Sequence, residues 1–289
     1  MFFGFFVKKI IIKTGGCFMT TNNLLVNIAE NYLATLVDKG AEDLIALVGS
    51  EGLVADPRFG IITGEPSLKE FVFTFQDWLK DYSPKVQHLR TTATDKRVCS
   101  EDILFVDLGH EKWELAVGTV VCNRESGSGA KVHVYYTNWP FNNHSHSLRP
   151  ALFDKPEPGV QHTGVILRYF ESLLTGDLKK LATCFEADIY FREPSGPPYV
   201  HWGTNAVIEY FKGLFSNGAP MLREDTVTDD GRCAIMEFTV FGWNGKVWED
   251  PATHHAGLAC YERSNEGLMR CIRIYDDVDF TPGSSVTSG

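Results

Sequence analysis

Residues 165–194 read VILRYFESLLTGDLKKLATCFEADIYFREP, and this stretch sets out the order helix, helix, strand. Gly176–Asp177 joins a helix C-cap to a helix N-cap, which predicts two helices separated by a tight break. A run rich in aromatic and β-branched residues then predicts a strand, which ends on a carboxylate and a proline, Glu193–Pro194. The order indicates a domain in which helices precede the sheet.

The first half of the chain repeats this order. Asp56 follows Tyr32 by 24 residues, and Glu193 follows Tyr169 by the same 24 residues. Each carboxylate–proline pair is followed by a glycine, a third helical pattern and a long strand-like region with hairpin signals. The repeat predicts an α+β fold of two tandem cone-shaped domains, each a curved antiparallel sheet wrapped around helices. The open end of such a cone is a natural pocket.

Composition divides the chain further. Between the two copies, Pro, Gly, Asn and His are frequent, as in a linker. The N-terminal apolar stretch is interrupted by three lysines and is too short to cross a bilayer, so we expect a leader outside the fold, with either Met1 or Met19 as the start. The predicted parts are residues 1–18 (leader), 19–140 (first domain), 141–161 (linker), 162–280 (second domain) and 281–289 (disordered tail).

Net charge and cysteine content indicate which partners and which cellular compartment to expect. The formal net charge is −10, which disfavours binding to nucleic acid or to anionic membrane surfaces. The seven cysteines include no CxxC pair, and several lie in apolar strand-like runs. They read as reduced, buried side chains, so we expect a cytoplasmic protein.

The two copies resemble the nuclear-transport-factor-2-like superfamily, and within it the SnoaL-like and ketosteroid-isomerase-like branch. The second copy carries the stronger resemblance, in the segments Leu167–Arg168–Tyr169–Phe170, Thr175–Gly176–Asp177–Leu178, Phe185–Glu186–Ala187–Asp188, Arg192–Glu193–Pro194 and Trp202–Gly203. The first copy matches through Asn31–Tyr32–Leu33, Ala55–Asp56–Pro57 and Thr63–Gly64. The resemblance implies a cystatin-like α+β barrel in each half. It does not select an activity, because the superfamily includes isomerases, cyclases, epoxide hydrolases, dehydratases and non-catalytic binders.

The resemblance also implies roles for four residues. The carboxylate before the proline is the general base of ketosteroid isomerases, and this position falls on Asp56 and Glu193. The tyrosine that donates to the developing oxyanion falls on Tyr32 and Tyr169. The second acid of that oxyanion hole would fall near Val120 and Leu258, where neither copy has a carboxylate, which disfavours ketosteroid isomerisation itself.

Polyether epoxide hydrolases of the same fold fit the tandem layout better, since they can occur as two fused domains with paired acids. The candidates for the second acid are Glu65 in the first copy and Glu249 or Asp250 in the second. The wider set of candidate pocket residues in the second copy is Tyr190, His201, Trp202, Glu249, Asp250, His254 and His255.

A carboxylic acid in an apolar cone has a raised pKa and can exchange a proton near neutral pH. Glu193 fits this description if it faces the cone, and reads as a turn-closing surface residue if it does not. Arg58 stands two residues after Asp56 and would make that carboxylate a stable anion if the two paired. Tyr32 and Tyr169 fit equally well as core tyrosines with satisfied hydroxyls.

Metal and cofactor sites are not indicated. His144 and His146 lie in the linker, and the adjacent His254 and His255 would point apart in a strand, so we predict no metal site. The sequence contains no GxGxxG, P-loop or GxSxG motif, and we predict no cofactor.

The leading hypothesis is a cofactor-independent enzyme of the isomerase, cyclase or epoxide-hydrolase type that acts on a small apolar molecule, with Glu193 and Tyr169 carrying most of the activity. The alternative is a non-catalytic protein that binds a hydrophobic ligand or serves as a scaffold or assembly adaptor. The sequence allows a monomer whose two copies pair within the chain, or a homodimer. An open cone with facing acids would favour catalysis, and a closed apolar cone would favour binding.

Overall fold

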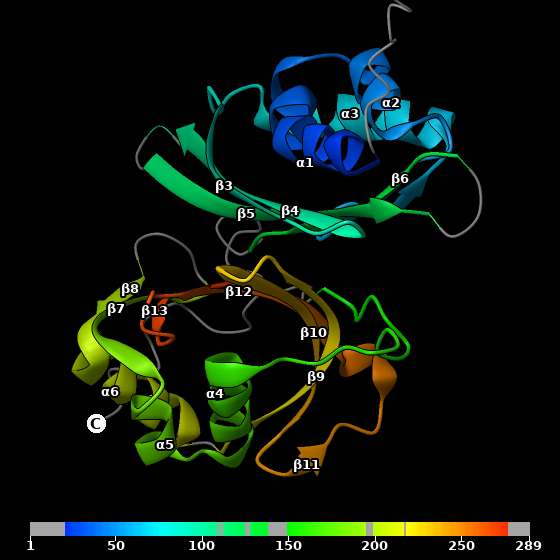
Figure 1. The fold of residues 1–289 in the computed structure, drawn as a ribbon. Helices are drawn as coiled ribbons and strands as arrows, with labels where there is room; N and C mark the ends of the chain where they lie inside the picture. The colour runs from blue at the N-terminus through cyan, green and yellow to red at the C-terminus, as the bar shows by residue number, and fades with distance from the viewer. Residues whose placement is uncertain are drawn as a thin grey trace, which may run out of the picture.

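A computed structural model describes residues 21–107, 109, 112–124, 128–137, 149–194, 199–216 and 218–276. Figure 1 shows two domains stacked with their sheets facing each other and their helices on the outer sides. The predicted leader, the predicted tail and residues 138–148 of the connection lie outside the described residues.

The first domain contains helices followed by a sheet whose strands lie between residues 53 and 135. Its described elements are α1 (Thr21–Asp38), α2 (Ala41–Val48), β1 (Leu53–Asp56), β2 (Gly60–Thr63), α3 (Glu65–Leu79), β3 (Lys85–Ala93), β4 (Arg97–Asp107), β5 (Lys112–Asn123) and β6 (Ala130–Tyr135).

The second domain repeats the order between residues 164 and 276. Its described elements are α4 (Gly164–Thr175), α5 (Leu178–Ala182), β7 (Phe185–Arg192), β8 (Val200–Trp202), α6 (Gly203–Phe215), β9 (Pro220–Asp229), β10 (Cys233–Trp243), β11 (Lys246–Val247), the 3₁₀ turn η2 (Pro251–Thr253), β12 (His255–Arg263) and β13 (Met269–Asp276).

Both sheets have the same topology, which confirms the predicted α+β class. The strand order is β2-β1-β6-β5-β4-β3 in the first sheet and β11-β10-β12-β13-β7-β8 in the second, where β9 pairs with β10. The long strands form antiparallel ladders, as predicted, from β3 to β6 in the first sheet and through β9, β10, β12 and β13 in the second. The first strand of each copy pairs in parallel with the last, β1 with β6 and β7 with β13, so each sheet is mixed.

Local sequence explains the helices and their ends. In α1 the apolar side chains recur at helical spacing and are buried against the sheet. In the second copy α4 ends at Gly176, whose φ of 67° places it in the left-handed region that favours glycine. Asp177 then caps α5 by accepting the backbone N–H of Lys180 at 3.0 Å. The predicted break between two helices is therefore confirmed.

The central strands of the sheets are buried on both faces. In β4, Val98 and Leu104 pack under the helices of their own domain, whereas Cys99 and Ile103 face the other domain. This interdomain layer combines apolar side chains from both copies: Cys99, Ile103, Ala116, Val120, Tyr135, Cys233, Ile235, Ala256, Leu258, Cys260 and Tyr275. Burial on both faces explains why these strands read as nearly continuous apolar runs.

Two buried charge clusters flank the apolar layer, and the first centres on Glu101 of β4. Arg273 of β13 binds the Glu101 carboxylate with two nitrogens, at 2.6 and 2.8 Å, and the Tyr275 hydroxyl donates to it at 2.7 Å. Arg273 also contacts Glu262, which accepts a second ion pair from Arg90. Burial by itself raises the pKa of Glu101, but these partners outweigh it and lower the pKa to about 2.

In the second cluster the glutamate comes from the second copy, and its partners across the interface come from the first. Glu237 is the fifth residue of β10, as Glu101 is of β4. It contacts His133 of β6 at 2.6 Å and accepts from Tyr135 at 2.8 Å, and Thr226 of its own domain donates to it at 2.6 Å. Each copy therefore places one glutamate among polar side chains from the last strand of the other.

The connection between the domains is fixed at Arg149. This side chain is 4% exposed, and its guanidinium lies 4.4 Å from the ring centre of Tyr135. Its terminal nitrogens donate to the carbonyl oxygens of Ala55, at 2.6 Å, and of Val134. Arg149, near the middle of the predicted linker, thus packs against the first sheet.

Gly118 of β5 lies where the two sheets are in close contact. A Cβ atom at this position would lie 2.4 Å from Cδ2 of Leu258 in the other domain. We expect Gly118→Ala to lower the free energy of unfolding by about 1–3 kcal/mol in urea denaturation, because the added methyl group overpacks the interface. In a Leu258→Ala background the same change should cost little, and an unchanged penalty there would contradict the contact.

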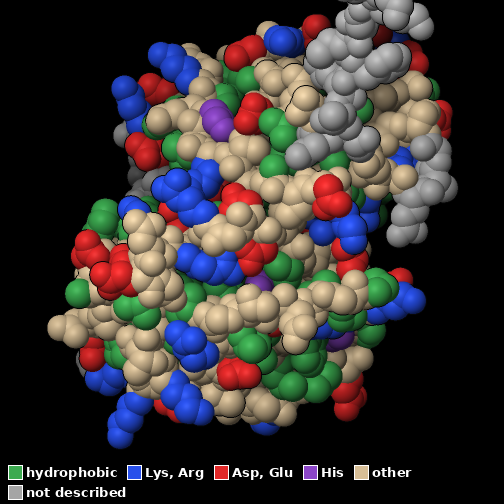
Figure 2. Space-filling view, in the orientation of Figure 1, with side chains coloured by type: hydrophobic (Ala, Val, Ile, Leu, Met, Phe, Trp, Pro, Cys, Tyr) green, Lys and Arg blue, Asp and Glu red, His purple; other side chains and the backbone are tan. Residues whose placement is uncertain are grey.

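The surface carries charges of both signs. On the face drawn in Figure 2, Lys and Arg side chains are interspersed with Asp and Glu, and both gather along the line where the domains meet. Six of the seven cysteines lie within the described ranges, and all six are free thiols. Within the same ranges, no helix has the length and apolar character needed to cross a membrane.

Candidate functional site

In the first domain, the carboxylate of Asp56 lies at the end of β1 and is 3% exposed. Its Oδ1 atom accepts the backbone N–H groups of Arg58, at 2.8 Å, and Phe59, at 3.0 Å, and the Tyr136 hydroxyl at 2.9 Å. Its Oδ2 atom is buried and has no hydrogen-bond partner among the described residues. Oδ1 is therefore held by three hydrogen bonds, whereas Oδ2 is available to accept a proton or a hydrogen bond.

Burial is the largest influence on the acidity of Asp56 and raises its pKa. The three hydrogen bonds to Oδ1 act in the opposite direction without cancelling it. Arg58 reaches Asp56 through its backbone, while its guanidinium carbon lies 4.5 Å from the ring centre of Trp78. The carboxyl group of Asp56 is therefore more easily protonated than that of a solvent-exposed aspartate.

Tyr32 of α1 is fully buried, and its hydroxyl has no partner among the described residues. Burial, reinforced by the charge of Asp56, raises its pKa well above the usual value, so this hydroxyl stays protonated and can only act as a donor or neutral acceptor. Tyr136 was not predicted from the sequence. Val132, Val134 and Tyr136 alternate toward the cone, and this period of two is the signal that could have identified it.

A small cavity lies beside this carboxylate, with about 10 Å³ of space open to a water molecule, which is room for about one water. Asp56 and Tyr136 provide its polar groups. The remaining lining is apolar: Leu33, Leu36, Phe75, Trp78, Leu104, Leu115, Val117 and Val134. The first cone therefore combines an apolar wall with one buried acid.

In the second domain the structure brings together Glu193 and His201, two of the residues singled out from the sequence. Glu193 is 3% exposed, and its Oε1 lies 2.6 Å from Nε2 of His201. The β7–β8 hairpin sets this geometry by pairing Phe191 with His201. In contrast to Asp56, this carboxylate has an imidazole partner.

Tyr169 is buried in an aromatic cluster. Its ring contacts those of Phe185, Phe211 and Tyr261. Phe211 in turn contacts Phe191, which packs against His201. Phenylalanine rings thus link Tyr169 to the Glu193–His201 pair.

The other candidates of the second copy lie elsewhere. Strand alternation places Tyr190 and Trp202 on the face of β7 and β8 opposite Phe191, so they face away from the cone. Glu249 and Asp250 are exposed, and Asp250 caps the turn η2 by accepting the backbone N–H of Ala252 at 2.9 Å.

The two adjacent histidines lie at the start of β12. Nε2 of His254 is 2.9 Å from the carbonyl oxygen of Trp248, and the ring of His255 stacks on Trp248 at 5.6 Å. Val120 and Leu258, the positions implied for a second acid, lie in the interdomain layer rather than in the cones.

His162 is a further buried group that was not predicted from the sequence. It lies between Phe170 and Tyr261, with Nε2 3.5 Å from Oε2 of Glu224 and 3.2 Å from the sulfur of Met236. Burial lowers its pKa to about 4, so it is neutral at pH 7. It is the first residue of the predicted second domain and precedes α4, so no helix or strand pattern marks it.

Residues 166–256 match the SnoaL-like domain family. Three similar solved structures are an NTF2-like protein of unknown function from Cytophaga hutchinsonii, the epoxide hydrolase/cyclase-like enzyme SalBIII of salinomycin pyran ring formation, and a protein of unknown function with a cystatin-like fold from Methylobium petroleophilum. Their identities to this chain are 15%, 16% and 20%, and their TM-scores are 0.32, 0.33 and 0.32. They cover 41%, 39% and 41% of this chain and 94%, 87% and 77% of their own.

No curated protein matches the sequence at a significant level. The family match falls within the second copy, and the first copy repeats the same strand order with its own sheet. The second copy therefore contains a SnoaL-like domain, and the first copy is a tandem domain with the corresponding order of strands.

Proposed function

We propose that the first domain binds a small, mostly apolar molecule in its cone and that Asp56 transfers a proton to or from it. One observation carries the proposal: Asp56 is buried, three donors hold its Oδ1, and Oδ2 has no partner beside an apolar cavity. A raised pKa brings the carboxyl group closer to neutrality, where a general base or acid works best.

The chemistry follows from these atoms. Asp56 in its ionised form accepts a proton from a carbon acid at Oδ2, and the electron pair of the broken C–H bond moves toward an electronegative atom of the ligand. Tyr32 offers a hydroxyl without a partner to that developing negative charge. Return of the proton from Asp56 to a second carbon completes an isomerisation and restores the carboxylate.

The size of the cavity limits the ligand. Space for one water does not hold a substrate, so binding requires the apolar side chains around Asp56 to move apart. Trp78 is half-buried, and it is the cavity-lining residue that Arg58 covers. We place the movement at this wall of the cone.

The test is turnover of cyclohex-3-enone, whose isomerisation to the conjugated ketone is followed by ultraviolet absorbance. We expect Asp56→Asn to reduce the rate by about 10²–10⁴-fold, because asparagine keeps the shape but cannot carry the proton. Glu193→Gln is the matched control in the other domain and should retain the wild-type rate. Equal rates for Asp56→Asn and the wild type would refute the assignment.

The second candidate function is binding without turnover, and the narrow cavity favours it. In that case the wild-type protein would bind the same ketone, observed as a change in tryptophan fluorescence that is absent in Trp78→Phe, and convert none of it. Asp56→Leu would then bind the ketone more tightly, because it removes a buried polar group.

A further inference from the structure

Arg192 of β7 is a buried cation on the face of the second sheet that points toward the first domain. It is 2% exposed, and its guanidinium carbon lies 4.4 Å from the ring centre of Tyr275. Its Nε and Nη2 atoms are buried and have no hydrogen-bond partner among the described residues. Buried arginine donors without partners are costly, because the guanidinium has lost its water.

The neighbouring arginine shows what these two nitrogens bind when they have a partner. Arg273 uses its own Nε and Nη2 to hold Glu101 side-on, at 2.6 and 2.8 Å. Glu262 is shared between Arg273 and Arg90. In this described cluster three arginines therefore face two glutamates, and Arg192 is the one whose donors contact neither.

Arg149 of the connecting segment provides an internal comparison, because it lies over Tyr135, which donates to Glu237 as Tyr275 donates to Glu101. Its guanidinium lies over Tyr135 at the same 4.4 Å that separates Arg192 from Tyr275. Both terminal nitrogens of Arg149 donate to carbonyl oxygens, of Ala55 and Val134. Nη2 of Arg149 therefore has an acceptor and Nη2 of Arg192 has none among the described residues, whereas Nε is without a partner there in both residues.

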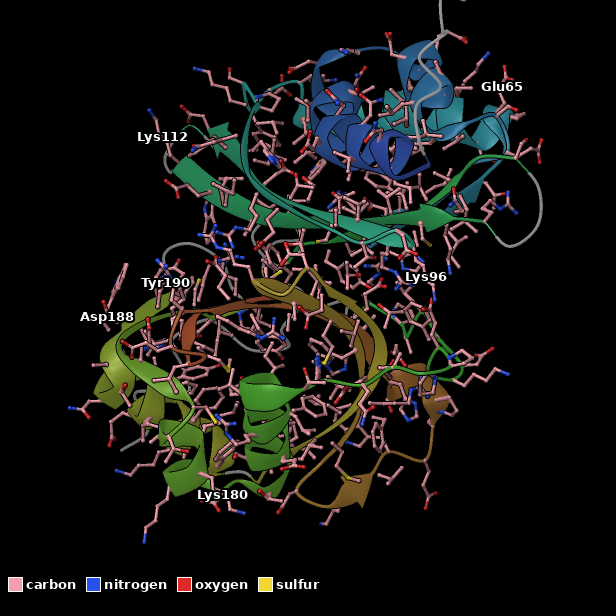
Figure 3. All side chains as sticks on the ribbon, viewed as in Figure 1. Glu65, Lys96, Lys112, Lys180, Asp188 and Tyr190 are labelled. Carbon is pink, nitrogen blue, oxygen red and sulfur yellow. The ribbon has the colours of Figure 1, made fainter. Side chains whose placement is uncertain are left out.

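An aromatic pair lies beside Arg192 on the same strand face. Tyr190 precedes Arg192 by two residues, and its ring contacts Trp202 with centres 4.8 Å apart. Figure 3 shows Tyr190 at the edge of the second domain that faces the first. Trp202 is 66% exposed, an unusual fraction for a large indole.

We propose that Arg192 is the anion-binding residue of a site between the two domains that takes a small carboxylic acid with a flat apolar body. The side-on edge of the guanidinium matches the two oxygens of a carboxylate, as the Arg273–Glu101 pair demonstrates within the same cluster. Tyr190 and Trp202 provide a ring surface for the apolar body. The site is independent of the Asp56 cavity, which lies inside the cone of the other domain.

The test is isothermal titration of the full chain with benzoate, with benzyl alcohol as the neutral analogue and inorganic phosphate as the competing anion. We expect benzoate to bind and the other two to bind at least about 10-fold more weakly, since each lacks either the charge or the planar pair of oxygens. Arg192→Gln should weaken benzoate binding by about 10- to 100-fold. Arg149→Gln is the matched control and should bind benzoate like the wild type.

A second variant covers the case in which Arg192→Gln fails to fold. Arg192→Lys retains the positive charge but loses the paired donors, and should also weaken binding by about 10-fold or more, with an unchanged melting temperature. Unaltered benzoate affinity in either folded variant would overturn the proposal. Stronger binding of phosphate than of benzoate would overturn the assignment to carboxylic acids.

Discussion

Replacing Arg273 with methionine should lower the free energy of unfolding by about 3–5 kcal/mol, the cost of leaving a buried charge without its partner. Arg273 holds Glu101 through two nitrogens and also contacts Glu262. Methionine preserves much of the side-chain volume, so the loss reports Glu101 without its ion-pair partner rather than a cavity, while Glu262 keeps its pair with Arg90. Urea denaturation followed by circular dichroism measures it.

Arg263 is the matched control for this experiment. It also binds a carboxylate with two nitrogens, Asp229 at 2.8 and 2.5 Å, but the two side chains are 15% and 28% exposed. Because water can solvate Asp229 when its partner is removed, Arg263→Met should lower the free energy of unfolding by about 1 kcal/mol or less. Equal losses for the two variants would mean that the interdomain cluster is no stronger than a surface pair.

The free energy of unfolding should fall steeply as the pH is lowered from about 4.5 toward 2. The pKa values of Glu101 and Glu237 are lowered to about 2 in the folded state, because their buried partners outweigh the effect of burial. A depressed carboxyl pKa contributes stability above the unfolded value of 4.5, and this contribution is lost as the pH falls toward 2. The unfolding free energy should therefore fall by up to roughly 2.7 kcal/mol per pH unit, the limit for two protons taken up on unfolding.

Denaturation by urea at successive pH values between 5 and 2.5 measures this slope. Asp56 acts in the opposite direction, since its pKa is raised and its protonation favours the folded state. Glu237→Gln removes one of the two titrating groups, and its slope should be about half that of the wild type. A wild-type stability that stays flat between pH 4.5 and 2.5 would contradict the paired state of both glutamates.

The sequence predicted the fold because its signals are local. Gly176–Asp177 specifies a cap pair, and the equal spacing from Tyr32 to Asp56 and from Tyr169 to Glu193 reveals the repeat. The mixed character of the sheets was not predicted, since a parallel pair joins strands from opposite ends of a domain and leaves no local signal.

The sites were harder to predict because they depend on which face of a strand each side chain occupies. Tyr190 was grouped with the wall around Glu193, although its alternation with Phe191 places it on the opposite face. The pairing of Glu193 with His201 depends on the register of a hairpin. Whether Asp56 was paired with Arg58 depended on where the long arginine side chain lies, and the structure places it over Trp78.

The reciprocal clusters around Glu101 and Glu237 also bear on how the two halves can evolve. In an assembly of identical subunits every substitution occurs on both sides of the symmetry axis at once, so a contact can change only if both copies tolerate it. Covalent linkage removes that restriction, and the same glutamate meets Arg273 at one end of the interface and His133 at the other. A gene that encodes both halves can thus specialise one of them while the other preserves the contact surface.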